Sequence, residues 1–456
     1  MKNKKGFILS TYVYILLVFF LLLLSTMLAV LNNTRLLSNK LKEQSSSTSG
    51  LANKDFSFVL LGDKDMTLFK GDEFIDPGYI IKTSGGHDLS NIVKVTGSVN
   101  SDTAGMYELT YTATYNGVTK TLSRNVEVVM LPTAVEKIES LAITGNTEGL
   151  IPDDTTDHNI RYAGGSPKNY ISFNNELWRI IGTFNVTTSS GNTEKLVKIV
   201  RDSSIGSYSW DSSTGNNNGA HGTGEVNDGY GVNQWGSSTY TNGSTYEGAD
   251  LMRELNSFYL NSQSGTCYNG FNNLTTSCNF SEIGIKDAYR SMIETVIWST
   301  GAFGLETSAL AAYGQERGTT TGKSCTSGAP NSAVYCTDSV NRTTTWQGKV
   351  GLIYPSDYGY ASTNTSCRGK INEDSSYSCK NDNWLHINLT YWTISPVARP
   401  DLSVSAWCTS SDGHISNYYG GASVSAGVRP TVYLKSDVSI IGGDGSSTNP
   451  YKISMN

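Results

Sequence analysis

The sequence is poor in the residues from which catalytic and nucleic-acid sites are usually built. It has only 5 histidines, and charged residues make up 16% of the chain with a formal net charge of -6. Without a basic balance there is no electrostatic footprint for a phosphate backbone, so nucleic acid is not an expected partner. Proline is sparse at 10 residues, whereas glycine is abundant at 46. This composition is typical of a β-rich extracellular protein.

Sequence motifs for catalysis and metal binding are also missing. Neither H-E-x-x-H nor G-x-S-x-G occurs, and the cysteine spacings do not fit the usual C-x2-4-C zinc pattern. Hard oxygen donors do gather in glycine-rich turns without following the EF-hand order, which favours ordinary turn chemistry over a calcium site. We therefore assign no catalytic residue, cofactor or metal site. The isolated histidines are His87, His158, His221, His386 and His414, and the oxygen donors are Asp211, Asn216–Asn218, Asn227, Asp228 and Asp444.

The most apolar stretch of the chain lies at its N-terminus. Lysines at positions 2, 4 and 5 precede an uncharged run from Tyr12 to Leu31. A helix from Phe7 to Leu31 would be roughly 38 Å long, enough to cross about 30 Å of hydrocarbon. The lysines predict an N-terminus inside the cell. Residues 1–44 are therefore expected to be a single membrane span, with the bulk of the chain on the extracellular side of the cell membrane.

Three interpretations of this segment remain open: a cleaved signal peptide, an uncleaved signal anchor and a type IV pilin-like leader. The third rests on a resemblance, because Lys5-Gly6 followed by Phe7 and a long apolar helix resembles a prepilin site cleaved between Gly6 and Phe7. Thr11 departs from that pattern, since pilins carry Glu at this fifth mature position. The departure argues against assembly into a filament. All three interpretations export the bulk of the chain.

The cysteines indicate the same compartment. Six of the 7 form three close pairs, each bracketing turn-forming residues. We predict local disulfides, each stabilising the fold by roughly 3 kcal/mol in the chain-entropy model. Cys408 is left over in an apolar stretch and is expected to be a buried free thiol. The predicted pairs are Cys267 with Cys278, Cys325 with Cys336, and Cys367 with Cys379.

Residues 45–53 are rich in serine and read as a flexible spacer before an all-β domain at 54–130. Strand-like segments separated by turn residues continue to Met130, and period-two alternation is clear from Tyr107 to Ala113. Asp76-Pro77-Gly78 is a turn signal, since proline fixes φ and glycine follows freely. A unit of this length and pattern is expected to be a β-sandwich.

This domain resembles the bacterial Ig-like domain family of surface proteins and toxins. The resemblance lies in LLGDKDMTLFKGDEFIDPGY, VTGSVNSDTAGMYELTYTATYNG and RNVEVV. It implies a role as a stalk or an adhesion module. The matching positions are Gly62, Asp63, Gly71, Asp72, Asp76, Pro77, Gly78, Gly105, Tyr107, Tyr111 and Arg124.

Residues 131–168 are expected to be a linker with a short helix at 133–143, and an α+β domain follows at 169–456. That domain opens with a predicted hairpin, ELWRIIGTFNV and EKLVKIVRD. Apolar residues at helical spacing then predict two helices, at 249–260 and 281–298. Strand-like segments fill the remainder, and Asp412-Gly413 is expected to turn a hairpin between two of them.

The second domain resembles a family of uncharacterised bacterial surface modules with a C-type lectin-like fold. The resemblance lies in NELWRIIGTF, WTISPVARP, SSDGHIS and GVRPTVYLKSDV. It implies a fold related to the formylglycine-generating enzymes and phage receptor-binding tips, with ligands held by loops near the last strands. Enzyme activity of that kind requires reactive cysteines in the core, and Cys408 has no obvious partner.

Aromatic residues in glycine- and asparagine-rich stretches are the candidate ligand-binding residues. Tyrosine and tryptophan offer rigid area with a polar tip, although such residues also pack their own loops, and that alternative stays open. The sequence thus predicts a membrane-anchored recognition or adhesion protein for an unknown glycan or protein ligand. A pilin-like or structural envelope component is the alternative, and an extracellular enzyme is less favoured. The candidates are Tyr230, Trp235, Tyr240, Tyr246, Tyr418 and Tyr419.

Overall fold

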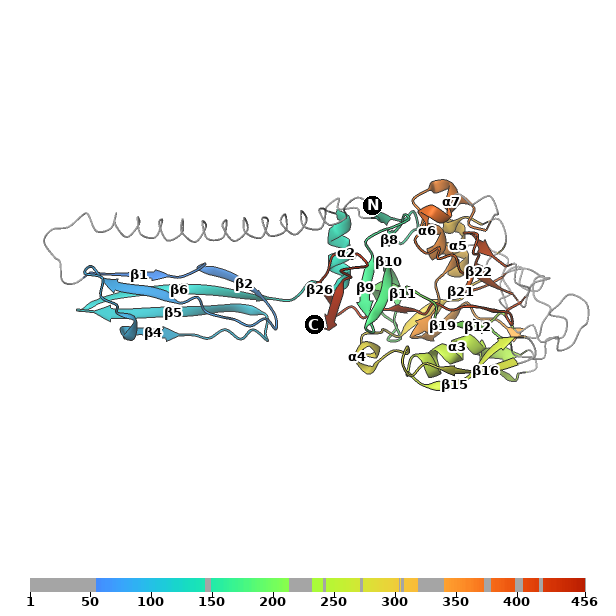
Figure 1. Cartoon of the computed structure of the whole chain (residues 1–456), viewed down its shortest axis with the longest axis horizontal. Helices are drawn as coiled ribbons and strands as arrows, with labels where there is room; N and C mark the ends of the chain where they lie inside the picture. The colour runs from blue at the N-terminus through green and yellow to red at the C-terminus, as the bar shows by residue number, and fades with distance from the viewer. Residues whose placement is uncertain are drawn as a thin grey trace, which may run out of the picture. The chain divides into compact units, whose positions relative to one another are not determined.

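The chain forms two compact units, and the boundary falls between Met130 and Leu131 (Figure 1). The computed structural model describes residues 55–143, 149–212, 232–240, 243–270, 274–302, 304, 307–318, 340–372, 379–397, 405–417 and 421–455. Among these residues, no helix combines the length and the apolar character that crossing a membrane requires. The predicted span at 1–44 and its possible cleavage site at Gly6 and Phe7 lie outside the described residues.

The first unit is a β-sandwich, as its alternating pattern predicts. One sheet has the order β2-β6-β5-β4, with β2 parallel to β6, and the other pairs β1 with β3. Leu109, Tyr111 and Ala113 point inward from the longest pattern of alternation and are buried. The strands are β1 (Phe56–Leu60), β2 (Asp65–Phe69), β3 (Tyr79–Thr83), β4 (Val93–Thr96), β5 (Gly105–Tyr115) and β6 (Val118–Val129).

A buried arginine ties the turns of this sandwich together. The Arg124 guanidinium, fully buried on β6, donates from Nη2 to the carbonyls of Leu61 and Gly78, at 2.7 and 3.0 Å. Its Nε lies 3.2 Å from the Asp76 carboxylate, which also accepts a hydrogen bond from the Tyr111 hydroxyl at 2.8 Å. The predicted turn is present, because Gly78 adopts φ +80° and its N–H bonds the Asp76 side chain. Four positions of the family resemblance thus meet in one network.

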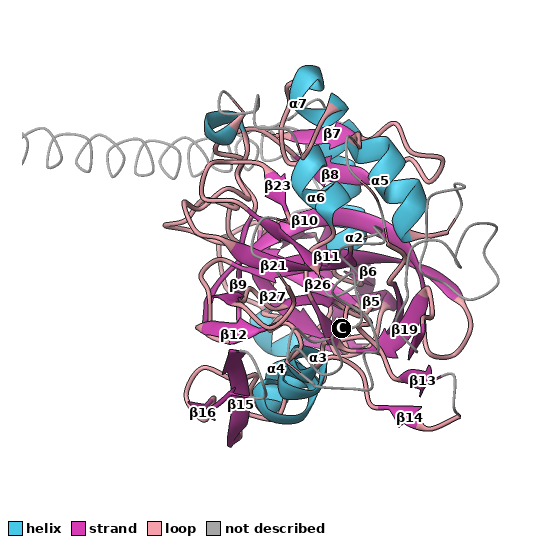
Figure 2. Cartoon of the chain, turned by 90° about the vertical axis from the view of Figure 1, so that its right-hand side faces the viewer, coloured by secondary structure: helices cyan, strands magenta, loops and turns pink. Residues whose placement is uncertain are grey.

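The second unit is built mainly from two sheets with few helices. The larger has seven strands in the order β20-β25-β11-β10-β8-β7, with β9 also paired to β10. The predicted hairpin is its centre, formed by β10 and β11, and both of its faces are buried, since consecutive residues along each strand are buried. Figure 2 shows α5, α6 and α7 gathered at one side of the sheets and α3 and α4 at the opposite side.

The bounds of the elements of the second unit are as follows. The seven-stranded sheet contains β7 (Leu150–Pro152), β8 (Ile160–Tyr162), β9 (Tyr170–Phe173), β10 (Glu176–Thr187), β11 (Thr193–Arg201), β20 (Val350–Gly351) and β25 (Thr431–Tyr433). The five-stranded sheet contains β12 (Ser207–Ser209), β21 (Tyr391–Pro396), β22 (Ala406–Thr409), β23 (Ile415–Ser416) and β24 (Ser425–Gly427). Smaller sheets contain β13 (Ser238–Tyr240), β14 (Thr245–Tyr246), β15 (Ser264–Gly270), β16 (Leu274–Asn279), β17 (Val296–Ser299), β18 (Val340–Asn341), β19 (Thr345–Gly348), β26 (Val438–Gly442) and β27 (Lys452–Met455).

The described helices of this unit are short. They are α2 (Ala134–Ile143), α3 (Asp250–Glu254), α4 (Asp287–Arg290), α5 (Ala309–Glu316), α6 (Pro355–Tyr360) and α7 (Thr365–Gly369), with a π-helical turn at Leu255–Tyr259 and a 3-10 turn at Lys380–Asp382. The helix predicted at 249–260 is confirmed as α3 with its π-helical continuation. Leu251, Leu255 and Tyr259 face the core from it.

Two of the predicted disulfides are confirmed, Cys267–Cys278 and Cys367–Cys379. The first closes the β15–β16 hairpin. The third pair, Cys325 and Cys336, lies outside the described residues. Cys408 is a buried free thiol, as predicted, and burial raises its pKa to about 12. The predicted turn at Asp412-Gly413 is also confirmed, since it joins the antiparallel pair β22 and β23.

The helix predicted at 281–298 is wrong. Only Asp287–Arg290 is helical, and Val296–Ser299 forms strand β17, paired with β19. Thr295, Val296 and Ile297 are β-branched, so a helix restricts their side chains, whereas an available partner strand accommodates them. The apolar residues at helical spacing, such as Ile285 and Ile293, are buried through turns instead.

The predicted linker at 131–168 is instead part of the second unit. Its β7 and β8 form the edge of the seven-stranded sheet, with β8 paired to β10. Its helix α2, predicted correctly, buries Ala134 and Ile138 in the core of that unit. Proline and polar residues suggested a connector locally, but long-range pairing with β10 decides the structure.

Candidate functional site

Asn233 joins the ends of separate stretches of chain in the second unit. Its buried side chain donates from Nδ2 to the Val397 carbonyl at 3.1 Å and to the Ser405 carbonyl at 3.0 Å. Its Oδ1 accepts a hydrogen bond from Nε of the buried Arg342 at 2.8 Å. Val397 and Ser405 are the described residues on either side of 398–404, so one amide fixes both ends of that segment.

Two buried aspartates hold the ends of the segment 213–231 next to Asn233. The Asp211 carboxylate accepts from the Val232 N–H at 2.6 Å and from the Tyr246 hydroxyl at 3.0 Å. The Asp250 carboxylate accepts from both the N–H and the hydroxyl of Ser212, each at 2.9 Å. Ser212 and Val232 are the described residues that flank the segment. We call Asp211, Asn233, Tyr246, Asp250 and Arg342 the anchor cluster.

Tryptophan packing makes the base of the anchor cluster rigid. The Trp235 ring lies 5.2 Å from the Trp210 ring and 6.1 Å from the Trp346 ring, and the first two are fully buried. The Trp210 indole N–H donates to the Thr393 carbonyl of β21 at 3.0 Å. The anchor cluster is therefore bound to the five-stranded sheet through buried aromatic side chains.

The six candidate aromatic residues have different surroundings. Trp235 is fully buried and Tyr246 is 3% exposed. Their rings pack inside the unit, as in the alternative that the sequence left open. For Tyr240 only the backbone is described, in β13, where it pairs with Val340. Tyr230, Tyr418 and Tyr419 lie outside the described residues. The ligand-binding prediction for these candidates therefore stays a prediction.

Sequence reasoning missed Asn233 and Arg342, because single polar residues among many others carry no spacing signal. The sequence indicated Asp211 as an oxygen donor, and in the structure it is a hydrogen-bond acceptor within the anchor cluster. Its oxygens accept hydrogen bonds from the Val232 N–H, the Tyr246 hydroxyl and the Asp250 N–H. Among the described residues, no group of histidine, cysteine, aspartate and glutamate side chains has the arrangement for a metal ion.

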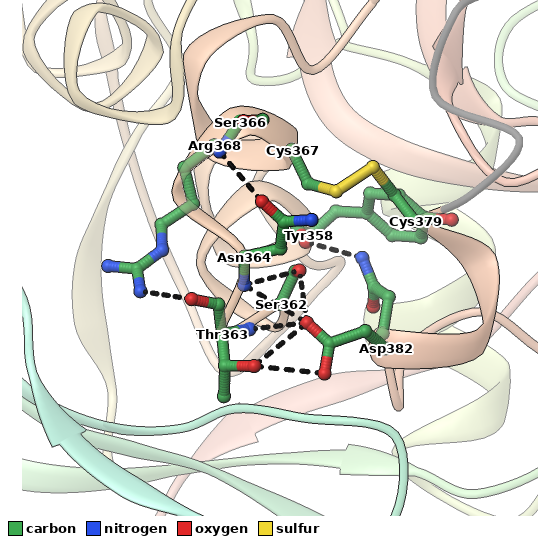
Figure 3. The surroundings of a disulfide bond; sticks show 10 residues. Tyr358, Ser362, Thr363, Asn364, Ser366, Cys367, Arg368, Cys379 and Asp382 are labelled. Atoms are coloured by element: carbon green, nitrogen blue, oxygen red, sulfur yellow. Dashed lines mark hydrogen bonds between the residues drawn. A yellow bond between two sulfur atoms is a disulfide. The ribbon is translucent and has the colours of Figure 1, made fainter.

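A second polar network surrounds the Cys367–Cys379 bridge (Figure 3). The Asp382 carboxylate accepts hydrogen bonds from the Ser362 hydroxyl at 2.7 Å and from the Thr363 and Asn364 N–H groups at 2.9 and 3.0 Å. Burial alone would raise the pKa of Asp382, but these bonds outweigh it and hold that pKa below its ordinary value. A hollow beside the bridge has room for about one water-sized group. The network secures the turn between α6 and α7.

Glu254 is a perturbed carboxyl group near the anchor cluster. Burial raises its pKa to about 8, although the Tyr268 N–H bonds its Oε1 at 2.6 Å. The bond ties α3 to the disulfide-closed hairpin β15–β16. Glu254 therefore contributes to the packing of that hairpin.

Among solved structures, two similar ones cover only part of the chain at low identity. One is a lipoprotein from Bacteroides thetaiotaomicron, at 23% identity and a TM-score of 0.17, covering 32% of this chain and 56% of that one. Another comprises the CBM51-2 domain in complex with GlcNAc and INT domains of Clostridium perfringens ZmpB, at 12% identity and a TM-score of 0.15, covering 34% of this chain and 30% of that one. This chain thus spans little more than half of the one and less than a third of the other, and TM-scores this low support no inference about its fold or function.

No curated protein sequence matches the chain significantly. A family model does match its first unit. The matched residues, 58–128, cover β2, β3, β4 and β5, the last three residues of β1 and all but the last residue of β6. They include Asp76, Tyr111 and Arg124, which form the buried network of that unit. Residues 58–128 are accordingly identified as an Ig-like domain of the family described as bacterial surface protein, Ig-like domain.

Proposed function

We propose that the chain is a membrane-anchored recognition or adhesion protein of the bacterial cell surface. In this proposal the Ig-like unit is a stalk and the second unit binds an extracellular glycan or protein. The family of residues 58–128 supports a surface location. Two disulfides support an oxidising compartment, because such bonds persist outside the cytoplasm.

The anchor cluster is the observation that carries the binding role. Asn233 and Asp211 hold the ends of two segments, 213–231 and 398–404, at one place in the second unit. Binding residues of proteins concentrate on connections held by such scaffolds. The segment 213–231 is rich in glycine and asparagine and contains Tyr230. We propose that the ligand contacts the face of the second unit at which these ends lie.

The lectin-like interpretation and the single N-terminal span belong to the same proposal. The apolar run at 12–31 supports a membrane anchor. The second unit has two main sheets and only short helices among its described residues, which supports a lectin-like fold more than a helical one. We propose that the protein is not an enzyme. The perturbed carboxyl groups Glu254 and Glu316 are buried in packing networks, which favours a structural role for them.

Binding to a broad array of glycans and matrix proteins tests the proposal. The full chain in detergent micelles should bind a reproducible subset, and Asn233→Ala should lose at least tenfold in affinity. Asn169→Ala is the matched control, because Asn169 is also fully buried and bonds Arg179 and the Ile180 carbonyl in the seven-stranded sheet. Both changes should cost a comparable 1–3 kcal/mol or so of stability, so an equal loss of binding in both would contradict a role for the anchor cluster. Silence of the wild-type chain on every array would favour a structural envelope component.

A further inference from the structure

A lysine and an aspartate lie buried side by side at the centre of the second unit. Lys198 of β11 is fully buried, and its Nζ donates to Oδ2 of Asp357 at 2.5 Å. Asp357 belongs to the first turn of α6 and is 2% exposed. The two residues are 159 positions apart in sequence. Neither belongs to the anchor cluster or to a predicted site.

Aromatic rings enclose the lysine side chain. Its Nζ lies 3.9 Å from the centre of the Tyr354 ring, 5.4 Å from that of Trp298 and 5.5 Å from that of Tyr433. Burial of this kind makes separate charges costly, by several kcal/mol for each ion even after relaxation, although the aromatic faces themselves attract the cation. Burial, only partly offset by Asp357, lowers the pKa of Lys198 to about 8. A larger fraction of the Lys198 amine is therefore neutral at this site than it would be in water.

Arg161 polarises the carboxyl group from the other side. Its Nη1 donates to Oδ1 of Asp357 at 2.8 Å, while its Nε donates to Asp153 at 2.6 Å. The Tyr354 N–H donates to Oδ2 at 2.9 Å. Burial raises the pKa of Asp357, but the charges of Lys198 and Arg161 outweigh it, so that pKa lies below its ordinary value. The arrangement places donors on both carboxyl oxygens, where a tetrahedral intermediate would develop charge.

We propose that Lys198 and Asp357 condense to an isopeptide bond that joins β11 to α6. A nitrogen hydrogen-bonded this closely to a carboxyl oxygen lies roughly 3–3.5 Å from the carboxyl carbon, which is the distance range of a near-attack geometry. One proton passes from the ammonium to the carboxylate through their hydrogen bond. The amine then attacks Cγ, the Cγ–Oδ2 bond breaks, and Oδ2 leaves as water with the second proton of the nitrogen. Oδ1 stays as the amide carbonyl, held by Arg161.

The surrounding charges suit the product as well as the reactants. Condensation removes one positive and one negative charge, and Arg161 keeps Asp153 as its partner. Glu316 of α5 contacts Ser356, the residue before Asp357. It accepts hydrogen bonds from the Ser356 N–H at 2.9 Å and from the Ser356 hydroxyl at 2.5 Å. Burial raises the pKa of Glu316 to about 7, so it can stay protonated beside the reacting carboxyl group.

Mass spectrometry of the reduced, alkylated and denatured full chain tests the proposal. We expect the mass to fall below that of the uncondensed chain by one water, about 18 Da, and a proteolytic digest to contain a branched peptide joining Lys198 to Asp357. Locating the loss in that peptide separates it from leader cleavage and from dehydration elsewhere. Recovery of Lys198 as a free amine, with no branched peptide, would overturn the proposal and leave a buried ion pair.

Variants extend the test. Lys198→Met should remove the mass loss, whereas Lys195→Met should keep it, because Lys195 on the same strand makes a solvent-exposed pair with Glu139 at 2.7 Å. Asp357→Asn should release ammonia instead, a loss of about 17 Da if the cross-link still forms. Should a variant fail to fold, the wild-type digest alone decides the matter.

Discussion

At the scale of single residues, buried charges define both units. Arg124 in the Ig-like unit donates to backbone carbonyls that belong to different turns. Lys198 and Arg161, which both pair with Asp357, form the corresponding network in the second unit. The sequence shows these residues as ordinary charged positions, because burial is a property of the whole fold.

Replacing Arg124 by methionine should destabilise the Ig-like unit by roughly 3 kcal/mol, since it removes the guanidinium donor of the buried carbonyls and the positive partner of the Asp76 carboxylate. Thermal unfolding should show a lower transition for this unit alone. Lys94→Gln is the control, because Lys94 is exposed on the same sheet. An unchanged transition in Arg124→Met would show that the network does not hold the turns.

Glu316 should make the second unit less stable as the pH rises. Its pKa is about 7 in the folded chain, against an ordinary value of 4.5, so the folded state binds more protons between these values. The contribution of the protonated group is complete below about pH 4.5 and is lost as the pH rises through 7, by roughly 3 kcal/mol in total. Chemical denaturation of the second unit between pH 5 and 8 should show this loss, and Glu316→Gln should make the slope smaller, leaving the part that Glu254 contributes through its own raised pKa. Parallel pH profiles for both proteins would refute the assignment.

At the scale of elements, side chains fix how short helices meet the sheets. Helices α6 and α7 are too short to be stable alone, so their connection needs the bonds that Asp382 provides. The β15–β16 hairpin similarly combines a disulfide with the bond from Tyr268 to Glu254.

Asp382→Ala should release the turn between α6 and α7. The change leaves the Thr363 N–H without its acceptor and the Asn364 N–H with only the Ser362 hydroxyl, and it should cost roughly 1–3 kcal/mol of stability. Hydrogen exchange of these two amides should accelerate more than exchange in β10. Asp287→Ala is the control, because that side chain is 94% exposed and pairs only with Arg290 at the end of α4. Equal protection of the Thr363 and Asn364 amides in Asp382→Ala and the wild type would contradict the role of Asp382.

At the scale of the whole molecule, the two units have separate hydrophobic cores and should unfold in separate transitions. The cysteines all belong to the second unit. Breaking the disulfides should therefore change the thermal stability of the second unit and not that of the Ig-like unit.

A reducing agent should lower the transition of the second unit by several degrees and leave that of the Ig-like unit in place. Each opened bridge removes roughly 3 kcal/mol in the chain-entropy model. Calorimetry of the full chain with and without the reductant measures both transitions at once. Equal shifts in both would contradict the disulfide assignment, and salt at the same ionic strength controls for the added reagent.

Local patterns predicted the fold where a short stretch decides its own structure. Alternation from Tyr107 to Ala113 and the turn chemistry of Asp412-Gly413 were enough to place strands and a hairpin. The helix at 281–298 failed because the pairing of Val296–Ser299 with β19 depends on residues about 50 positions away. The anchor cluster could not be predicted, since Asn233 meets Val397 and Ser405 only after the sheets have formed.

The sequence by itself determined the apolar N-terminal run, the Ig-like strands and the pairs Cys267–Cys278 and Cys367–Cys379, because periodicity, turn residues and short loop closure act between neighbours along the chain. Only the tertiary structure decided that residues 131–168 belong to the second unit, that Trp235 is packed inside and that Lys198 faces Asp357. Those outcomes follow from burial and from contacts between distant segments, which exist only once the core has closed.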